Sequence, residues 1–166
     1  MIINVAQQLK GFLGDRRQYS IDETTSEGVP IKAEITLVRT HRSILVTGQF
    51  NTQVDSVCSR CLDEFMQPVT FQLEEEFFPL RDLSTDMPAH VDEGTDAFFI
   101  GEDNILDLNE AVRQNMLLNL PAKPICRPEC AGLCQRCGCN LNYGPCHCSE
   151  ESSDPRWSPL RELFSK

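Results

Sequence analysis

The chain has 166 residues, 40% of them hydrophobic, and its 25 acidic and 15 basic residues give a formal net charge of -10. These values are typical of a globular domain and argue against a disordered, collagen-like or coiled-coil chain. The charge also argues against a protein whose whole surface binds nucleic acid. No stretch approaches the roughly 18 apolar residues of a membrane span, and polar residues interrupt residues 1–14 where a secretion signal needs an apolar run. We therefore expect a cytoplasmic protein without a membrane partner.

The negative charge is concentrated in the middle of the chain. Residues 63–107 contain thirteen acidic residues and a single base, Arg81, which gives this stretch a net charge of -12 and leaves +2 for the remainder. Within it, residues 79–96 combine Pro, Gly, Ser and acids without apolar periodicity, so we expect a solvated loop there. An anionic partner is therefore disfavoured at this stretch rather than over the whole protein.

Alternating apolar and polar residues predict three long strands, at 31–37, 44–58 and 65–77. Their alternation indicates an antiparallel sheet with one solvated face. Residues 17–23 and 97–100 are expected to join it. Strands of this length predict a twisted sheet or a small open barrel.

Residues 107–120 change to a helical period, with Asp107 as the expected cap, Glu110 completing a capping box, and Pro121 ending the helix. This helix is expected to cover the apolar face of the sheet. The predicted fold class is therefore α+β, mainly β. We expect a β-rich core domain at residues 1–121, followed at residues 122–166 by a cysteine-rich, zinc-ribbon-like segment and a short C-terminal helix over 154–164.

Nine cysteines form two groups, a Cys58-x-x-Cys61 pair in the predicted hairpin turn and seven more within residues 126–148. In the reducing cytosol such spacing indicates metal binding rather than disulfides. Two four-thiolate sites of structural zinc are the preferred interpretation, with Cys139 left over as a spare thiol. The first site would use Cys58, Cys61, Cys126 and Cys130, and the second would use Cys134, Cys137, Cys146 and Cys148.

Several alternatives stay open at this point. A single local site could use Cys126, Cys130, Cys134 and Cys137, and the short Cys146-x-Cys148 spacing leaves room for His147 as a ligand. An iron–sulfur cluster could use the same thiolates. A thioredoxin-like pair is disfavoured because Cys58-x-x-Cys61 lies in a hairpin and not at the start of a helix. Catalytic zinc is disfavoured because an all-thiolate shell leaves no open position.

Motifs of enzymes are not found in the sequence. It has no phosphate-binding glycine loop, no G-x-S-x-G and no H-E-x-x-H. The three histidines lie far apart along the chain. We therefore expect no enzyme and no small-molecule substrate.

Basic residues do accompany the cysteines, and they are the candidates for contacts with RNA phosphates: Arg60, Lys123, Arg127 and Arg136. The competing interpretation is that these residues only balance the acidic middle of the chain. Composition alone does not separate the two.

Several motifs together resemble one family. They are the Cys58-Ser-Arg-Cys61-Leu hairpin, the helix ending Leu-Asn-Leu-Pro121, the cysteine block from Cys126 to Asn142, and the tail from Asp154 to Leu160. With the acidic middle of the chain, they resemble the YceD family of large ribosomal RNA subunit accumulation proteins, found in bacteria and with relatives in chloroplasts. The resemblance implies a non-enzymatic factor required for synthesis, processing or stability of large-subunit ribosomal RNA.

The partners that this resemblance implies are large-subunit ribosomal RNA or a pre-ribosomal particle, and also a large-subunit ribosomal protein. One alternative function is therefore an adaptor or chaperone, in which the acidic stretch shields a basic ribosomal protein. Another is a thiol redox or metal-handling protein.

Overall fold

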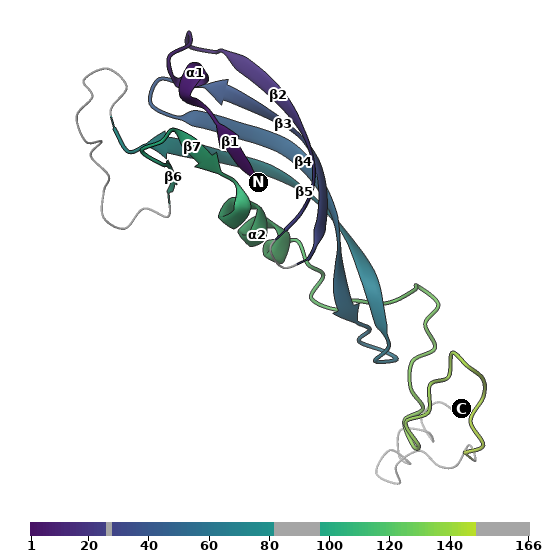
Figure 1. The fold of residues 1–166 in the computed structure, drawn as a ribbon. Helices are drawn as coiled ribbons and strands as arrows, with labels where there is room; N and C mark the ends of the chain where they lie inside the picture. Colours follow the sequence, from purple (N-terminus) through teal and green to yellow (C-terminus); the bar gives the residue numbers. More distant parts are fainter. Residues whose placement is uncertain (26–27, 82–96, 149–166) are drawn as a thin grey trace, which may run out of the picture.

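The computed structural model describes residues 1–25, 28–81 and 97–148. Its main feature is a five-stranded sheet whose strands follow one another in the order of the sequence (Figure 1). The first four strands pair antiparallel with one another, whereas the fifth pairs parallel to the fourth. The strands are β2 (Arg16–Thr24), β3 (Pro30–Arg39), β4 (Ile44–Val57), β5 (Glu64–Pro79) and β6 (Phe98–Ile100). The mainly β fold with an open, curved sheet confirms the predicted fold class.

A second, two-stranded sheet pairs β1 (Ile2–Asn4) with β7 (Ile105–Asp107) in antiparallel register. A single helical turn, α1 (Ala6–Leu9), follows β1. These three elements are not predictable from the sequence pattern, because three or four residues are too few to show a period. They join the chain start to the segment that enters the second helix, α2 (Asn109–Leu118).

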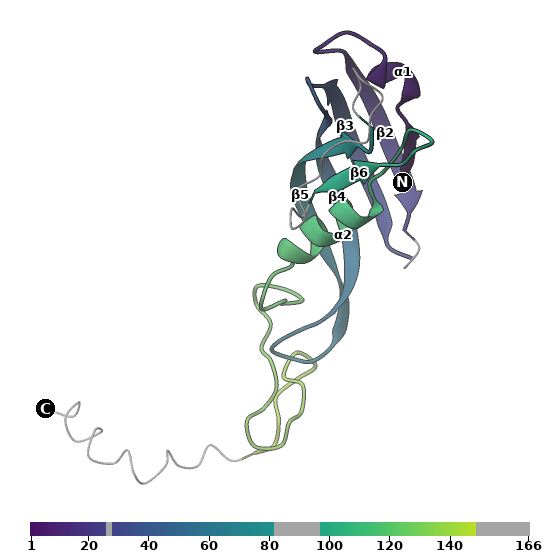
Figure 2. The ribbon, with the colours of Figure 1, turned by 90° about the vertical axis from the view of Figure 1, so that its left-hand side faces the viewer.

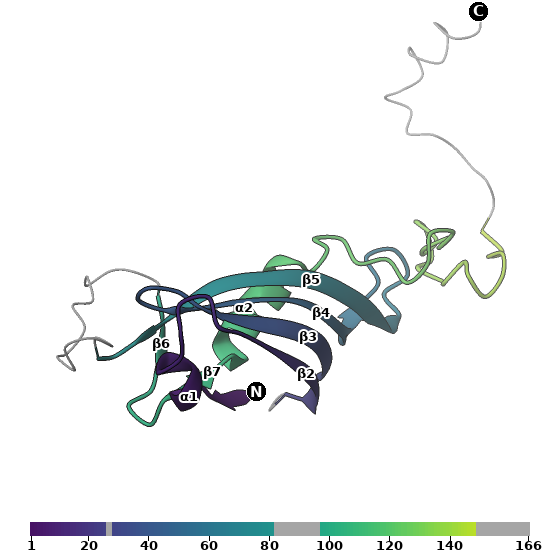
Figure 3. The same cartoon turned by 90° about the horizontal axis from the view of Figure 1, so that it is seen from above.

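The core lies between one face of the large sheet and α2 (Figure 3). The apolar residues of the predicted alternating pattern are the buried ones. Examples are Leu37, Val46 and Phe50, whose side chains are fully buried. Phe50 stacks on Phe71 with ring centroids 5.2 Å apart. From the helix, Ala111, Val112 and Met116 are buried against them, so the prediction that a helix covers the apolar face is confirmed.

Glu75 is a charged residue on the apolar face of β5, and a contact with α2 accounts for its presence there. Asn115 of α2 donates its side-chain amide to the Glu75 carboxylate at 3.3 Å. The half-buried acid therefore has a polar partner.

The helix is shorter than predicted, covering 109–118 instead of 107–120. Asp107 is the last residue of β7 and pairs with Ile2, so its backbone is extended. Its carboxylate still accepts a hydrogen bond from the Asn109 N–H at 2.9 Å. The capping box is not formed, because the Glu110 carboxylate binds Arg113 instead.

The β4–β5 hairpin is longer than the rest of the sheet. β3 pairs with β4 only as far as Thr52 of β4. Beyond that residue, β4 and β5 stay paired with each other down to Val57 and Glu64. The hairpin therefore extends away from the core as an arm. The cysteine-rich segment, defined here as residues 121–148, leaves α2 and folds around the tip of this arm (Figure 2).

Two predicted features lie outside the described residues: the helix over 154–164 and nearly all of the loop over 79–96. Neither of the helices in the described part of the chain is long and apolar enough to span a membrane.

Candidate metal centre

The tip of the β4–β5 hairpin is a tight turn that directs two thiols to one side. The Cys58 N–H donates to the Asp63 carbonyl at 2.9 Å, and the Leu62 N–H donates to the Cys58 carbonyl at 3.0 Å. Leu62 adopts a positive φ of 62°, which closes the turn. Inside it, the Arg60 N–H points at the Cys58 sulfur at 3.5 Å. Backbone N–H groups aimed at sulfur favour a thiolate, as in zinc knuckles.

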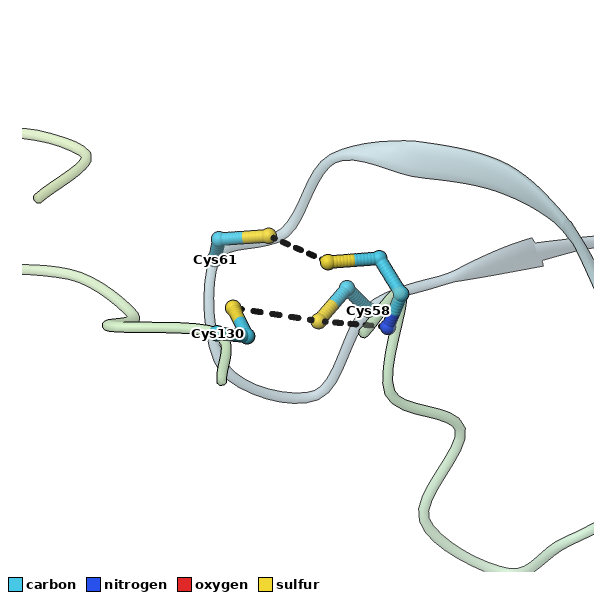
Figure 4. Close-up of side chains that lie close together, drawn as sticks. Cys58, Cys61 and Cys130 are labelled. Carbon is cyan, nitrogen blue, oxygen red and sulfur yellow. Dashed lines mark hydrogen bonds between the residues drawn. The ribbon is translucent and has the colours of Figure 1, made fainter. Parts of the chain in front are cut away.

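The cysteine-rich segment brings two more thiols to this turn (Figure 4). The Ser59 N–H donates to the Pro124 carbonyl at 2.8 Å, which fixes the incoming chain beside the hairpin. The Cys126 N–H then reaches the Cys58 sulfur at 3.4 Å. Cluster one therefore contains Cys58, Cys61, Cys126 and Cys130, whose sulfurs all lie within 4.8 Å of one another.

The spacing of these sulfurs fits a single tetrahedral ion. Cys58 and Cys130 sulfurs are 3.9 Å apart, and those of Cys61 and Cys126 are 3.7 Å apart. A Zn–S bond of about 2.3 Å in a regular tetrahedron gives sulfur–sulfur edges of about 3.8 Å. A disulfide would need about 2.05 Å, and all four thiols are free.

Cluster one is enclosed by protein. Cys58, Cys61 and Cys130 are 0%, 3% and 4% exposed, and the side chains of Phe65 and Ile125 pack against them. A buried four-sulfur shell leaves no open position for a substrate, which is the arrangement of structural rather than catalytic zinc.

Cluster two is local to the cysteine-rich segment and more exposed. It contains Cys134, Cys137, Cys139 and Cys146, with sulfurs within 4.8 Å of one another. The Cys134 N–H donates to the Cys139 carbonyl at 2.8 Å, and the Arg136 N–H points at the Cys134 sulfur at 3.5 Å. Cys137 and Cys139 are exposed.

The membership of cluster two differs from the sequence prediction at two residues. Cys139, interpreted as a spare thiol, belongs to this set of four, and Cys148 does not. The physical reason is the turn at Gly138, whose positive φ of 72° folds Cys139 back beside Cys134. The Cys148 thiol still interacts with the sulfurs of Cys137, Cys134 and Cys146, which raise its pKa to about 12. Nothing in the spacing distinguishes Cys137-x-Cys139 from Cys146-x-Cys148.

Within cluster one, the pKa of one thiol is lowered and that of its neighbour is raised. The Cys126 N–H, helped by the Cys61 and Arg60 N–H groups, outweighs burial and lowers the pKa of Cys58 to about 6. The Asp63 N–H favours the Cys61 thiolate, but burial and the neighbouring sulfurs outweigh it and raise the pKa of Cys61 to about 12.

Cluster two repeats this pattern. The N–H groups of Cys137 and Arg136 lower the pKa of Cys134 to about 6, whereas the Cys137 sulfur raises the pKa of Cys139 to about 12. In both clusters, ionising one thiol makes it harder to ionise its neighbours. A bound cation would remove that repulsion.

The four basic candidates lie at the same end of the molecule, around the hairpin tip and the cysteine-rich segment. All are exposed residues. Arg60 donates to the Cys130 carbonyl at 3.1 Å, and Arg127 donates to the Asn142 side chain at 2.8 Å, so both also stabilise the segment. Lys123 and Arg136 are exposed on the same segment, and Lys123 directly precedes Pro124, whose carbonyl accepts from Ser59 of the hairpin. The structure therefore gathers these residues near one end without showing a nucleic-acid contact.

Sequence reasoning missed the polar residues that connect the segment to the hairpin. Asn140 donates to the Asp63 carboxylate at 2.8 Å, and Tyr143 donates to the same carboxylate at 3.3 Å. Asn142 contacts cluster one. Their only signal in the sequence is the run Asn140-Leu-Asn142-Tyr143 among the cysteines, which by itself predicts a turn.

Fold and clusters together define a mainly β protein in which a long hairpin and a cysteine-rich segment meet at candidate metal centres. Residues 46–164 match the family described as "Large ribosomal RNA subunit accumulation protein YceD", and the chain belongs to this family. The matched region contains all nine cysteines.

Relatives occur in bacteria and plants. An uncharacterised protein of Mycobacterium tuberculosis is 32% identical over 140 residues, which cover 83% of this chain and 64% of the relative. The chloroplast protein of Arabidopsis thaliana named large ribosomal RNA subunit accumulation protein YCED homolog 1 is 24% identical over 160 residues, 82% of this chain and 49% of the relative. The chain thus spans less than two thirds of these relatives' lengths. No solved structure matches it.

Proposed function

We propose that each cysteine cluster holds one structural zinc ion, cluster one through Cys58, Cys61, Cys126 and Cys130. The sulfur–sulfur distances of 3.7 and 3.9 Å support one ion with four thiolate ligands at this site. For cluster two, the sequence and the geometry agree on three ligands, Cys134, Cys137 and Cys146. The geometry supplies Cys139 as the fourth sulfur, and the Cys148 thiol interacts with this group. Zinc would neutralise the crowded thiolates and order a segment that has little apolar core of its own.

We further propose that the chain is a non-enzymatic, cytoplasmic factor in ribosome biogenesis that binds large-subunit ribosomal RNA or its precursor particle. The family name and the names of the plant relatives support a role in accumulation of this RNA. Direct binding is supported by one observation: exposed basic residues occur both in the hairpin turn and in the cysteine-rich segment that packs on it, namely Arg60, Lys123, Arg127 and Arg136. Clustered, rigidly held bases are suited to phosphate contacts.

RNA crosslinking and sequencing in cells tests this proposal, because it reports contact rather than a downstream effect. The test variant is Lys123→Gln with Arg136→Gln, which removes two exposed positive charges of the segment and leaves in place the hydrogen bonds that Arg60 and Arg127 donate. The matched control is Arg16→Gln with Lys32→Gln, which removes two exposed positive charges from β2 and β3.

Wild type and control are expected to crosslink to large-subunit ribosomal RNA, and the test variant is expected to lose most of that signal. In vitro, each lost phosphate contact should reduce the slope of log affinity against log salt by about one. Absence of ribosomal RNA from the wild-type crosslinks, or equal losses in test and control variants, would contradict direct binding.

An adaptor for a basic ribosomal protein is the second candidate. It is favoured by the solvated face of β5, where Glu74 and Glu76 are exposed on the side of the sheet opposite the core. RNase-resistant capture of one basic ribosomal protein, lost in Glu74→Gln with Glu76→Gln, would support this function over RNA binding.

A further inference from the structure

Asn142 lies between two ligands of cluster two in the sequence, yet its side chain belongs to cluster one. Its amide nitrogen points at the Cys130 sulfur, 3.4 Å away. Its amide oxygen accepts hydrogen bonds from the Ala131 N–H at 2.9 Å and from Arg127 at 2.8 Å. A single side chain therefore contacts the sulfur of Cys130 and the backbone directly after it.

The contact with Cys130 is of the kind that tunes a metal ligand. An N–H donor to sulfur favours the thiolate, which is the form that binds a metal ion. Groups that hydrogen-bond a metal ligand orient it, and removing them typically lowers metal affinity about 10–100-fold. Asn142 has the position of such a group toward cluster one.

Backbone hydrogen bonds hold the loop that carries Asn142 against the hairpin. The Leu133 N–H donates to the Arg60 carbonyl at 3.1 Å, and the Leu141 N–H donates to the Gly132 carbonyl at 2.8 Å. Gly132 has a φ of 74°, and a Cβ on it would lie 3.2 Å from the Arg60 carbonyl oxygen. The chain thus passes directly over the hairpin tip, and a side chain at residue 132 would be both crowded against the Arg60 carbonyl and strained by the positive φ.

The same loop is fixed at its other end by cluster two. Cys139 precedes Asn140 and Asn142, and Cys146 follows them, so a metal ion at cluster two would close a short ring of chain around both asparagines. Closing that ring would reduce the conformations available to Asn142 before it contacts Cys130.

We propose that Asn142 is a positioning residue that couples the two metal sites, so that filling cluster two tightens metal binding at cluster one. This inference rests on the zinc sites proposed above, and it requires nothing of RNA. Because coupling between two binding sites is reciprocal, filling cluster one must tighten cluster two by the same factor.

A double-mutant cycle on the full-length protein tests the coupling. The four proteins are wild type, Asn142→Asp, Cys134→Ser and the double variant. Asn142→Asp keeps an oxygen for Ala131 and Arg127. It removes the amide nitrogen that donates to the Cys130 sulfur and also, at 2.8 Å, to the Asn140 side-chain oxygen. Cys134→Ser removes a ligand of cluster two. The control is Asn119→Asp, which changes an exposed asparagine amide at the end of α2.

Two readouts are needed. Zinc affinity at cluster one is measured by chelator competition, and the protein loaded with ¹¹³Cd²⁺ gives one NMR resonance for each filled cluster, assigned through couplings to cysteine β-protons. Asn142→Asp is expected to lower cluster-one affinity about tenfold and to shift the cluster-one ¹¹³Cd resonance, because a donor to a ligand sulfur is lost. Asn119→Asp should change neither readout.

The cycle is expected to be non-additive. Cys134→Ser should lower cluster-one affinity several-fold in the wild-type background and have little further effect when Asn142→Asp is already present. Additive losses, or an unchanged cluster-one affinity in Cys134→Ser, would overturn the coupling. An unmoved cluster-one resonance in folded Asn142→Asp would overturn the positioning role. If either cluster failed to bind metal, both the zinc proposal and the coupling would be overturned. The ribosomal RNA proposal is tested separately, by crosslinking.

Discussion

The sheet with α2 and the cysteine-rich segment are ordered by different contacts. In the sheet, long alternating strands bury one apolar face against a helix, and residues such as Phe50 and Phe77 are fully enclosed. Within residues 121–148, all of which the structure describes, Cys130 is the only buried side chain, and Ile125, Leu133 and Leu141 are half-buried. The comparison indicates that hydrophobic burial stabilises the first region. The second buries too little apolar surface for this, and the proposed metal–thiolate bonds would order it instead.

The two regions meet at cluster one. Cys58 and Cys61 come from the hairpin of the sheet, and Cys126 and Cys130 come from the segment. The hairpin supplies rigid backbone N–H groups, and the segment supplies the enclosing turns. A metal ion at this point would fix the orientation of the segment, and with it the basic residues proposed to contact RNA.

Metal removal is expected to have the largest effect and to separate the two regions. Under reducing conditions, a strong zinc chelator should abolish amide-exchange protection over residues 122–148, because small zinc-ordered units unfold without their ion. Protection in β3, β4 up to Thr52, and α2 should persist, since their contacts contain no thiol. Hydrogen exchange measured by mass spectrometry checks this. Simultaneous loss of protection in both regions would contradict independent stabilisation.

Phe50→Ala is expected to destabilise the sheet and not the cysteine-rich segment. Phe50 is fully buried and stacks on Phe71, so its truncation should lower the free energy of unfolding of the sheet by about 3–5 kcal/mol. Urea titration followed by far-UV circular dichroism measures the loss, with Phe12→Ala as the control because Phe12 is 90% exposed. If Phe50→Ala lowered the free energy of unfolding by less than about 1 kcal/mol, this core would not be the main source of the sheet's stability.

A methyl group added at Gly48 tests the sheet more gently. A Cβ there would lie 2.6 Å from Ile35 Cγ2 and 2.7 Å from the Glu34 carbonyl oxygen. Gly48→Ala should therefore cost about 1–3 kcal/mol through overpacking, without changing the zinc content. Urea titration with metal analysis of the same sample measures both. Reduced zinc content in the folded protein would contradict the separation of the two regions.

Gly138→Ala is the matched change in the cysteine-rich segment and is expected to have the smallest effect. Nothing lies within 4 Å of the added methyl, but the φ of 72° strains any other residue by about 1–2 kcal/mol. Zinc affinity at cluster two should fall about tenfold, while the urea midpoint of the sheet stays unchanged. A lower urea midpoint with unaltered zinc affinity would reverse the expected pattern.

Much of the sheet could be predicted from the sequence because its strands are long. The alternation from Ile31 to Leu37 and along β4 identifies the buried face residue by residue. The prediction was incomplete where elements are short. β1, α1 and β7 have three or four residues each, too few for a period, and pairing of β7 with β1 moves the helix start from Asp107 to Asn109.

The grouping of cysteines was predictable where the fold limits it. The hairpin turn orients Cys58 and Cys61 together, and the end of α2 leaves only a short chain before Cys126, so their meeting follows from the topology. In cluster two, Cys139 and Cys148 have equivalent spacing to their neighbours, and only the backbone turn at Gly138 decides between them. Contacts of Asn140 and Asn142 depend on that turn as well, which is why the sequence did not reveal them.

Native mass spectrometry of the full-length protein, purified under reducing conditions without added metal, shows whether each cysteine cluster binds one zinc ion. We expect a mass increase corresponding to two zinc ions per chain, falling to one in Cys61→Ser and to one in Cys134→Ser. Bound iron in place of zinc would contradict the assignment of the metal. A protein that is folded, reduced and free of bound metal would contradict the proposal that metal–thiolate bonds order the cysteine-rich segment.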